Sequence, residues 1–543
     1  MIQFIRKITT NRYFETSLFF IVALINLLPA MENRFFPSMD GAAHLYNAKL
    51  ISLLIMEDND LLHMFYTFNE VLVPNWIGHF ILSVSGYFLP AYLAEKVLLI
   101  IYFLGLPFAF RALIRTIAPH SSVISFFIFP FTYSFLFTLG FYNFSLAIML
   151  MCIALTLALR SNSEVWSGKL TVGISALLIL TYFSHIVICG LVMLFLGLKV
   201  IWDLLYAYIE DRANFMSVIR LTSKRLGRLL VASAIPLALS FNYFSSMHSG
   251  ESSYEYLERG QLIDWIYSIK PLISYNDEIE GAETSKMCFI MALMLGIGIF
   301  ERVNRLLRDK KASITKAGRT KAIRADDIWA IFGLVCLLMY FFLPNSDGKA
   351  GFISVRLALL FFLFWTLYLA VQKLPKWFNW VCTLAFLFFS FNLNNYYSTV
   401  SHSLSKIARD CEETSRHIDR NSIVLPLNYH PNWLSAHFSN YLGIDKAVVI
   451  LENYELDVRY FPLRWKEASI PTTFLGDNTF SNDICRDWKS NSNNEELPID
   501  YVFLLGQFPE DLGNCDRQMK DLLTEKYKLV HRNKNTALFK RNT

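Results

Sequence analysis

A carboxylate and an imidazole stand four residues apart in the stretch Asp40-Gly-Ala-Ala-His44-Leu-Tyr-Asn47. Residues four apart share one face of a helix, so Asp40 and His44 would lie side by side, with Asn47 one turn further on. A carboxylate in such a place can act as a general base toward a hydroxyl. Asp also favours the N-cap position, so a capping role for Asp40 stays open. His44 either contacts substrate or bonds Asp40, and Asn47 either contacts substrate or lies on a solvated face.

Five other polar residues interrupt apolar sequence and are candidates for substrate binding. Tyr142 and Asn143 form a polar break between two apolar runs, which is either a site wall or a plain turn. His185 lies between two apolar runs, where an ionisable group is a functional candidate, although a structural histidine is equally compatible. Lys349 lies in a short Gly-containing loop, and Arg356 follows it at the start of an apolar run. A guanidinium suits phosphate geometry, whereas snorkelling to the interface is the alternative.

The chain around these residues has the composition of a membrane protein. Of its 543 residues 54% are hydrophobic and 17% are charged, against about 25% charged in a soluble chain. The net charge of +5 is modest, and we expect no nucleic-acid partner. Apolar runs of about 17–25 residues are long enough to cross a bilayer. We expect about eleven spans, at residues 14–30, 94–112, 121–139, 141–160, 170–186, 188–207, 228–246, 286–302, 327–343, 355–372 and 376–393.

Basic residues in the loops predict the orientation of these spans. The loop 302–324 holds nine Lys and Arg and a single acid, and the loop 212–228 holds five more basic residues. Placing these loops and the N-terminus in the cytoplasm requires that the loop 31–92 begin and end outside. The segment Ala42–Met56 is then an amphipathic helix, and Trp76–Leu89 a surface-lying or re-entrant one. The same orientation brings all the candidate residues to the extracytoplasmic side.

The sequence divides into a membrane domain, 1–393, and a water-soluble extracytoplasmic domain, 394–543. The second part has short β-type runs and one helical pattern, typical of a small α/β module. The expected strands start near Asn421, Ala447, Tyr501, Lys528 and Ala537, and the expected helix covers Asp511–Tyr527.

The sequence offers little evidence for a metal or a disulfide. Neither a CxxC nor an HExxH spacing occurs. Mg²⁺ or Mn²⁺ could bind Asp40, but no second acidic motif calls for one. Cys485 and Cys515 could pair in an oxidising compartment. The C-terminal domain has no N-x-S/T sequon, which favours a bacterial protein over one of the secretory pathway.

Two stretches carry a family resemblance. Pro37-x-x-Asp40-Gly-x-x-His44-Leu-x-Asn47-Ala48 and Tyr454-Glu-Leu-Asp-Val-Arg-Tyr-Phe-Pro-Leu-Arg-Trp resemble an uncharacterised bacterial branch of the GT-C superfamily. The resemblance extends to the layout of an acidic first exterior loop, many spans and a C-terminal exterior domain. GT-C proteins are integral-membrane glycosyltransferases that use polyprenyl-phosphate sugars.

The resemblance implies a bacterial inner-membrane enzyme that transfers a sugar from a polyprenyl-phosphate donor to a glycan, lipid or protein acceptor. Asp40 would act as the base in an inverting displacement, with His44 beside it, and Arg356 would help to hold the phosphate. Two other classes stay open. A lipid-linked sugar flippase or other transporter would more often show paired halves and midplane charges, and a non-catalytic envelope-assembly protein would leave Asp40 dispensable.

Overall fold

The computed structural model describes residues 12–161, 165–210, 215–246, 253–311, 323–348, 350–458, 460–466, 499–508, 510 and 513–542. The chain forms two compact units. Five helices have residues in both: α2 (Arg12–Glu32), α6 (Ala91–Ile117), α8 (Phe135–Thr138), α9 (Tyr142–Leu159) and α17 (Lys376–Ser415). The first, which we call the helical unit, comprises Met1–Leu28, Tyr102–Leu136 and Phe144–Tyr396. The second, the mixed unit, comprises Pro29–Ile101, Phe137–Asn143 and Tyr397–Thr543. The mixed unit thus contains the expected first loop together with the expected C-terminal domain.

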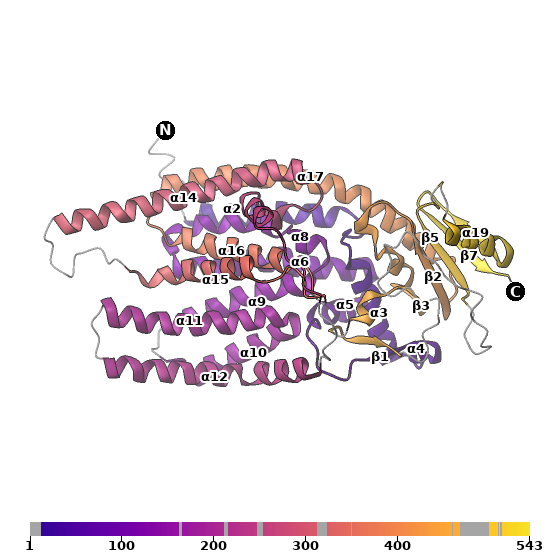
Figure 1. The fold of residues 1–543 in the computed structure, drawn as a ribbon, viewed down its shortest axis with the longest axis horizontal. Coiled ribbons are helices and arrows are strands. Elements are labelled where there is room, and N and C mark those ends of the chain that lie inside the picture. Colours follow the sequence, from indigo (N-terminus) through magenta and orange to yellow (C-terminus); the bar gives the residue numbers. More distant parts are fainter. Residues whose placement is uncertain are drawn as a thin grey trace. The chain divides into compact units, whose positions relative to one another are not determined.

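Long apolar helices dominate the first unit (Figure 1). Helix α10 packs against α11 and α12, and α15 packs against α16. The long helices are α2 (Arg12–Glu32), α6 (Ala91–Ile117), α9 (Tyr142–Leu159), α10 (Gly168–Ser184), α11 (Ile186–Glu210), α12 (Phe215–Ser246), α14 (Asp277–Lys311), α15 (Ile328–Phe342), α16 (Ile353–Ala370) and α17 (Lys376–Ser415). The shorter ones are η1 (Pro119–Phe127), α7 (Ile128–Phe131), α8 (Phe135–Thr138), α13 (Arg259–Tyr267), η2 (Lys270–Leu272) and η4 (Ala325–Asp327).

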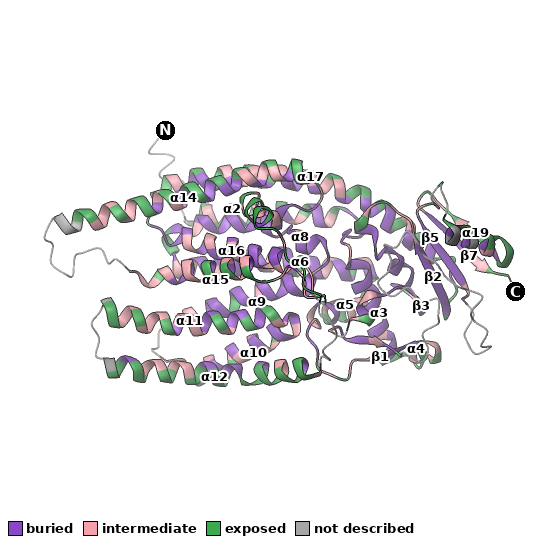
Figure 2. Ribbon diagram, viewed as in Figure 1, coloured by how far each residue is buried: buried purple, intermediate pink, exposed green. Residues whose placement is uncertain are grey.

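Nine helical segments of the described chain are long and apolar enough to cross a membrane. The expected span 170–186 is the 17-residue helix α10, and 376–393 begins the 40-residue helix α17; neither is among the nine. The polytopic α-helical architecture is therefore confirmed, but the count of eleven spans is not. Side chains such as Phe241 and Phe244 of α12 are apolar and exposed, and Figure 2 shows exposed residues along α11 and α12. Exposed apolar faces of this kind suit contact with lipid chains. The backbone of such a helix also needs no hydrogen bonds from its surroundings, because an α-helix satisfies them internally.

A five-stranded mixed sheet forms the core of the mixed unit, in the order β3-β2-β5-β7-β6 (Figure 1). Strand β2 is parallel to β3 and β5, whereas β7 is antiparallel to β5 and β6. The expected α/β module is confirmed, including each expected strand and the helix. Its elements are β2 (Ser422–Asn428), η5 (Trp433–Ser435), η6 (Phe438–Gly443), β3 (Val448–Ile450), α18 (Tyr454–Asp457), β4 (Leu463–Trp465), β5 (Tyr501–Leu505), α19 (Asn514–Lys526), β6 (Tyr527–Arg532) and β7 (Thr536–Arg541). Cys485 lies outside the described residues, and so does its possible pairing with Cys515.

The first loop supplies the other elements of this unit. They are α3 (Gly41–Met56), α4 (Asp60–Phe65), β1 (Tyr66–Phe68) and α5 (Ile77–Phe88). Strand β1 pairs antiparallel with β4, and the Tyr46 hydroxyl donates to the carbonyl of Val448 at 2.6 Å. Helix α3 was expected to be amphipathic, and this is wrong: twelve of its sixteen residues are buried (Figure 2). The physical reason is that α5 and η6 pack against α3 in the same unit.

Candidate active site

Asp40 occupies the N-cap position of α3, but its side chain makes no capping hydrogen bond. The residue is only 3% exposed, and its Oδ1 has no hydrogen-bond partner among the residues that the structure describes. Burial disfavours the charged form and raises the pKa of Asp40 to about 6, although the His437 and His44 rings oppose this shift. A buried carboxylate with such a pKa is suited to accept a proton near neutral pH.

The backbone around Asp40 is fixed by the turn that carries Gly140. The amides of Met39 and Asp40 donate to the carbonyls of Thr138 and Leu139, at 3.1 and 3.0 Å. Gly140 has a φ of +93°, and a Cβ added there would lie 2.7 Å from the Cβ of Asp40. Only glycine combines this backbone conformation with so close an approach. The turn therefore determines where the Asp40 carboxylate lies.

A buried imidazole faces Asp40. The Nε2 atom of His437 lies 3.8 Å from Oδ1 of Asp40, and its Nδ1 donates to Oε1 of Glu452 at 2.7 Å. The second oxygen of Glu452 accepts from the Ser439 hydroxyl and from the Asn440 amide. Burial alone would lower the pKa of His437, but attraction to Glu452 and Asp40 outweighs it and raises that pKa. These carboxylates therefore favour the protonated, positively charged form of the His437 ring beside Asp40.

A second carboxylate, Glu455, bridges two histidines, and we call His44, His79 and Glu455 the His–Glu–His cluster. Nδ1 of His44 lies 2.6 Å from Oε1 of Glu455, and Nε2 of His79 lies 2.7 Å from Oε2. The other ring nitrogen of each histidine faces a backbone carbonyl. Nε2 of His44 lies 2.8 Å from the carbonyl oxygen of Gly140, and Nδ1 of His79 lies 3.1 Å from that of Asn75.

All these partners are acceptors of hydrogen bonds, which decides the charge of the cluster. Both nitrogens of His44 must donate if Glu455 is ionised, so the ring is an imidazolium. Burial alone would raise the pKa of Glu455, but His79 and His44 lower it to about 2. Burial likewise opposes the charge on His44, and Glu455 overcomes this and raises the pKa of that ring.

Within the described part of the chain, this cluster is the group whose donor atoms could hold a metal ion, since they lie within 4.8 Å of one another. Two imidazole nitrogens and one carboxylate oxygen suit zinc rather than Mg²⁺ or Mn²⁺, which prefer oxygen ligands. The atoms are, moreover, joined at hydrogen-bond distances. The Mg²⁺ or Mn²⁺ considered from the sequence was placed on Asp40, which is not part of this cluster, so that metal stays a prediction, and we derive no chemical step through a metal.

Asn47 forms a reciprocal amide pair with Asn453. Its Nδ2 donates to Oδ1 of Asn453 at 3.0 Å, and Nδ2 of Asn453 donates back at 2.8 Å. Asn47 is 1% exposed, so the alternative of a solvated polar face is wrong. Because Asn453 stands between Glu452 and Tyr454, the pair ties α3 directly to the segment that carries both site glutamates.

Tyr142 and Asn143 also lie among these residues. The Tyr142 hydroxyl shares a hydrogen bond with the Ser38 hydroxyl at 2.7 Å, and its ring lies 5.4 Å from that of His44. Oδ1 of Asn143 accepts from the backbone amide of Gly78 at 2.7 Å. Gly78 lies in the first turn of α5, so Asn143 holds the helix that carries His79. Of the sequence-predicted residues, Asp40, His44, Asn47, Tyr142 and Asn143 are therefore brought together in the mixed unit.

His185 and Arg356 meet each other in the helical unit. Nη1 of Arg356 donates to Nε2 of His185 at 2.9 Å. The ring of Phe144 packs against both, 5.1 Å from the His185 ring and 5.5 Å from the Arg356 guanidinium carbon. Lys349, the remaining predicted residue, lies outside the described residues.

Sequence reasoning did not single out His79, His437, Glu452 or Glu455 as site residues. His79 did carry a signal, because it is an ionisable residue inside the otherwise apolar segment 76–89. Glu455 belongs to the stretch from Tyr454 on which the family resemblance was based. Nothing in the sequence around His437 and Glu452 indicated that they would lie beside a residue some 400 positions earlier.

A known structure has a similar fold. The chain is similar to the crystal structure of ArnT from Cupriavidus metallidurans bound to undecaprenyl phosphate, with a TM-score of 0.51 and 8% sequence identity. The similarity covers 96% of this chain and 97% of that one. The same protein in the apo state matches over the same shares with a TM-score of 0.49 and 10% identity. No family model matches the sequence, and no curated protein sequence matches it either. The polytopic helical membrane fold predicted for this chain, with its C-terminal strand-containing domain, is thereby confirmed as an ArnT-like fold.

Proposed function

We propose that the protein is an integral-membrane glycosyltransferase that moves a sugar from a polyprenyl-phosphate donor to an acceptor hydroxyl. The observation that carries the proposal is the Asp40 carboxylate, which is buried, lacks a hydrogen-bond partner on Oδ1 within the described chain, and faces the imidazole of His437. A buried carboxylate held in this state has no evident structural use, but it is what a general base requires. The undecaprenyl phosphate bound by the structurally similar ArnT supports a polyprenyl-phosphate donor.

The reaction would be a single displacement at the anomeric carbon. The acceptor oxygen forms a bond to that carbon while its proton passes to Oδ1 of Asp40. The bond from the anomeric carbon to the phosphate oxygen breaks, and the polyprenyl phosphate leaves with the electron pair. One displacement inverts the configuration. Asp40 is largely ionised at neutral pH because its pKa is about 6, and it is a stronger base than an ordinary carboxylate.

The neighbouring histidines would favour the ionised, proton-accepting form of Asp40. His437, held by Glu452, stabilises the ionised form of Asp40, and so does the imidazolium of His44. Both nitrogens of His44 are engaged by Glu455 and the Gly140 carbonyl, so we assign its role to its charge and to orientation.

The remaining predicted residues stay proposals for substrate binding. Arg356 and His185 are candidates for contact with an anionic group, since a guanidinium matches phosphate oxygens, and Lys349 is a further candidate cation. We propose a location in the bacterial inner membrane with the mixed unit outside, and a glycan, lipid or protein as acceptor. The side chains of Asn47, Tyr142 and Asn143 are hydrogen-bonded to other residues of the protein, so we assign them to positioning the site rather than to binding substrate.

The test is sugar transfer by purified protein offered a panel of labelled undecaprenyl-phosphate sugars. Wild type should transfer at least one sugar, and Asp40→Asn should not, at matched expression and folding. Asp58→Asn is the control, because it removes an exposed carboxylate in the same loop. Equal transfer by wild type and Asp40→Asn would rule out Asp40 as the base. No transfer from any donor would favour a transporter or an assembly protein.

A further inference from the structure

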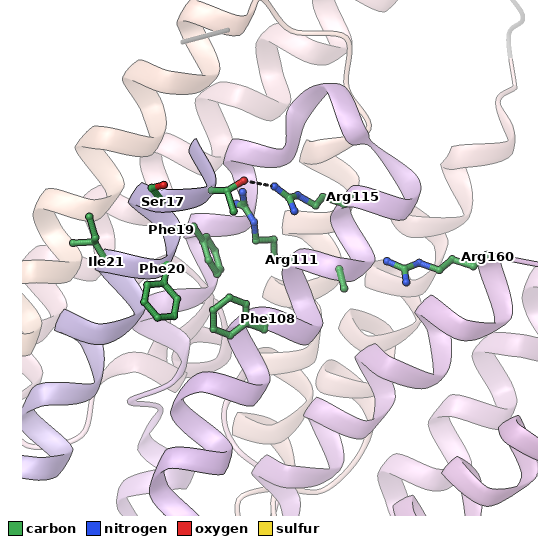
Figure 3. Close-up of a pocket in the computed structure, with 10 residues that line it drawn as sticks. Ser17, Phe19, Phe20, Ile21, Phe108, Arg111, Arg115 and Arg160 are labelled. Carbon is green, nitrogen blue, oxygen red and sulfur yellow. Dashed lines mark hydrogen bonds between the residues drawn. The ribbon is translucent and has the colours of Figure 1, made fainter. Parts of the chain in front are cut away.

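A pocket of about 460 Å³ opens between the first part of α2 and the last part of α6, within the helical unit. Its volume is in the range of about 300–1,000 Å³ that is usual for small-molecule sites. The pocket combines two kinds of lining, aromatic rings and arginines. Figure 3 shows the guanidinium groups of Arg111, Arg115 and Arg160 toward one side and the rings of Phe20 and Phe108 toward the other.

The apolar part of the pocket faces outward. Phe20 is 49% exposed, Ile21 52% and Phe108 39%, and all three lie on helices apolar enough to span a membrane. The rings of Phe20 and Phe108 lie 6.3 Å apart. In a bilayer, such a surface is a place for an acyl chain rather than for water.

The three arginines differ in the partners of their guanidinium groups. Arg111 is buried, pairs with Glu15 at 2.9 Å and lies over the ring of Phe19. Arg115 donates to the Thr16 hydroxyl at 2.7 Å, and Arg160 donates to the Thr116 hydroxyl at 3.2 Å. Neither Arg115 nor Arg160 has a carboxylate within ion-pair distance in the described segments, so the pocket carries uncompensated positive charge.

We propose that this pocket binds an anionic phospholipid of the bilayer, with the phosphate on Arg115 and Arg160 and an acyl chain along Phe20, Ile21 and Phe108. Charge complementarity is the argument for this occupant, since two guanidiniums that pair with no carboxylate of the described residues lie beside an apolar, exposed wall. Basic pockets between membrane helices on the cytoplasmic side are suited to anionic headgroups. The pocket lies at the start of α2, the end of this helix for which the sequence predicts a cytoplasmic location. Snorkelling would account for single arginines, but not for their convergence on one aromatic pocket from α6 and from the end of α9.

The experiment measures lipid binding to the full-length protein in detergent, by native mass spectrometry and by thermal shift. The probes are dioleoyl phosphatidylglycerol, dioleoyl phosphatidylcholine and undecaprenyl phosphate. Phosphatidylglycerol should bind and stabilise wild type more strongly than phosphatidylcholine, which has the same chains and phosphate but no net charge. The double variant Arg115→Gln/Arg160→Gln should bind phosphatidylglycerol about 25-fold more weakly, at about fivefold for each basic residue.

The control is Arg220→Gln/Arg228→Gln, which removes two exposed arginines of α12 and the same net charge. It should bind phosphatidylglycerol as wild type does. Equal binding of the two diacyl lipids to wild type would overturn the proposal. So would loss of binding in the control but not in the pocket variant, or displacement of phosphatidylglycerol by undecaprenyl phosphate at equal concentration. None of these outcomes depends on sugar transfer, so the lipid site and the proposed activity can fail separately.

Discussion

Replacing Asp40 by asparagine should stabilise the protein while it abolishes sugar transfer. The carboxylate is buried, and Oδ1 makes no hydrogen bond to the described residues that would offset its loss of hydration. At neutral pH the folded protein must keep this group ionised, which is unfavourable. Asparagine has nearly the same shape and no charge to desolvate. A base that is held ready for proton transfer is therefore held at the expense of folding stability.

The magnitude follows from the pKa of Asp40, which folding raises from 3.8 to about 6. A difference of about 2 units corresponds to about 3 kcal/mol, at 1.36 kcal/mol per unit. Below about pH 4 the carboxyl is protonated in both the folded and the unfolded state, and the variant gains nothing from the loss of charge. Between pH 4 and 6 the folded protein binds a proton that the unfolded chain has lost, so wild-type stability falls as the pH rises. Above pH 6 the full difference is present.

The assay is thermal unfolding of wild type and Asp40→Asn in one mild detergent, from pH 4 to pH 8. The stability difference should grow by about 3 kcal/mol between pH 4 and pH 6 and then stay level. Any cost of burying the new amide is independent of pH, because the amide does not titrate in this range, so it shifts the curve without changing its form. Asp58→Asn, at an exposed position, keeps Asp40, so its stability should fall between pH 4 and 6 as wild-type stability does. A constant difference between wild type and Asp40→Asn across the range would refute the reasoning.

Three further substitutions test the surroundings of Asp40. His437→Gln should move the acidic limb of the rate–pH profile above its wild-type position near pH 6, because the lost imidazolium no longer favours ionised Asp40; an unmoved limb would show that the ring does not act on Asp40. Glu455→Gln should lower the stability at pH 7 by about 3–5 kcal/mol, since it leaves a buried imidazolium without its counter-ion, and unchanged thermal unfolding would contradict the assigned charges. Gly140→Ala should destabilise by about 1–3 kcal/mol through crowding against Asp40 and should slow transfer. Gly190→Ala, where nothing lies within 4 Å of the added methyl group, should instead gain up to about 1 kcal/mol, and equal effects of the two changes would argue against the close approach.

The fold was largely predictable from the sequence because its signals are local. Apolar runs of bilayer length and β-type runs each report on consecutive residues, and the strands near Asn421 and Tyr501 appear as expected. The prediction that Ala42–Met56 is amphipathic was wrong for a related reason. Local polarity reports only that some residues are polar, and His44 and Asn47 turn out to be buried against polar partners supplied by distant segments.

The site itself was only half predictable. Asp40 and His44 share a short motif, whereas His437, Glu452 and Glu455 reach them only through the packing of α3 against the C-terminal part of the chain. A pairing such as His44 with Glu455 spans 411 positions, and no periodicity or spacing in one sequence encodes it. The capping role considered for Asp40 is not observed, because the side chain faces His437 instead.

The reciprocal pair of Asn47 and Asn453 has a consequence for how the protein is made. The two residues are 406 positions apart, and at roughly 5–20 residues per second a ribosome needs about 20–80 s to synthesise the chain between them. During that interval α3 lacks the partners that later cover His44, Tyr46 and Asn47. Its burial cannot be completed until the last quarter of the chain has emerged. A nascent chain arrested before Asn453 would thus expose helix α3, whatever the state of its membrane helices, and the candidate active site would be among the last parts of the protein to form.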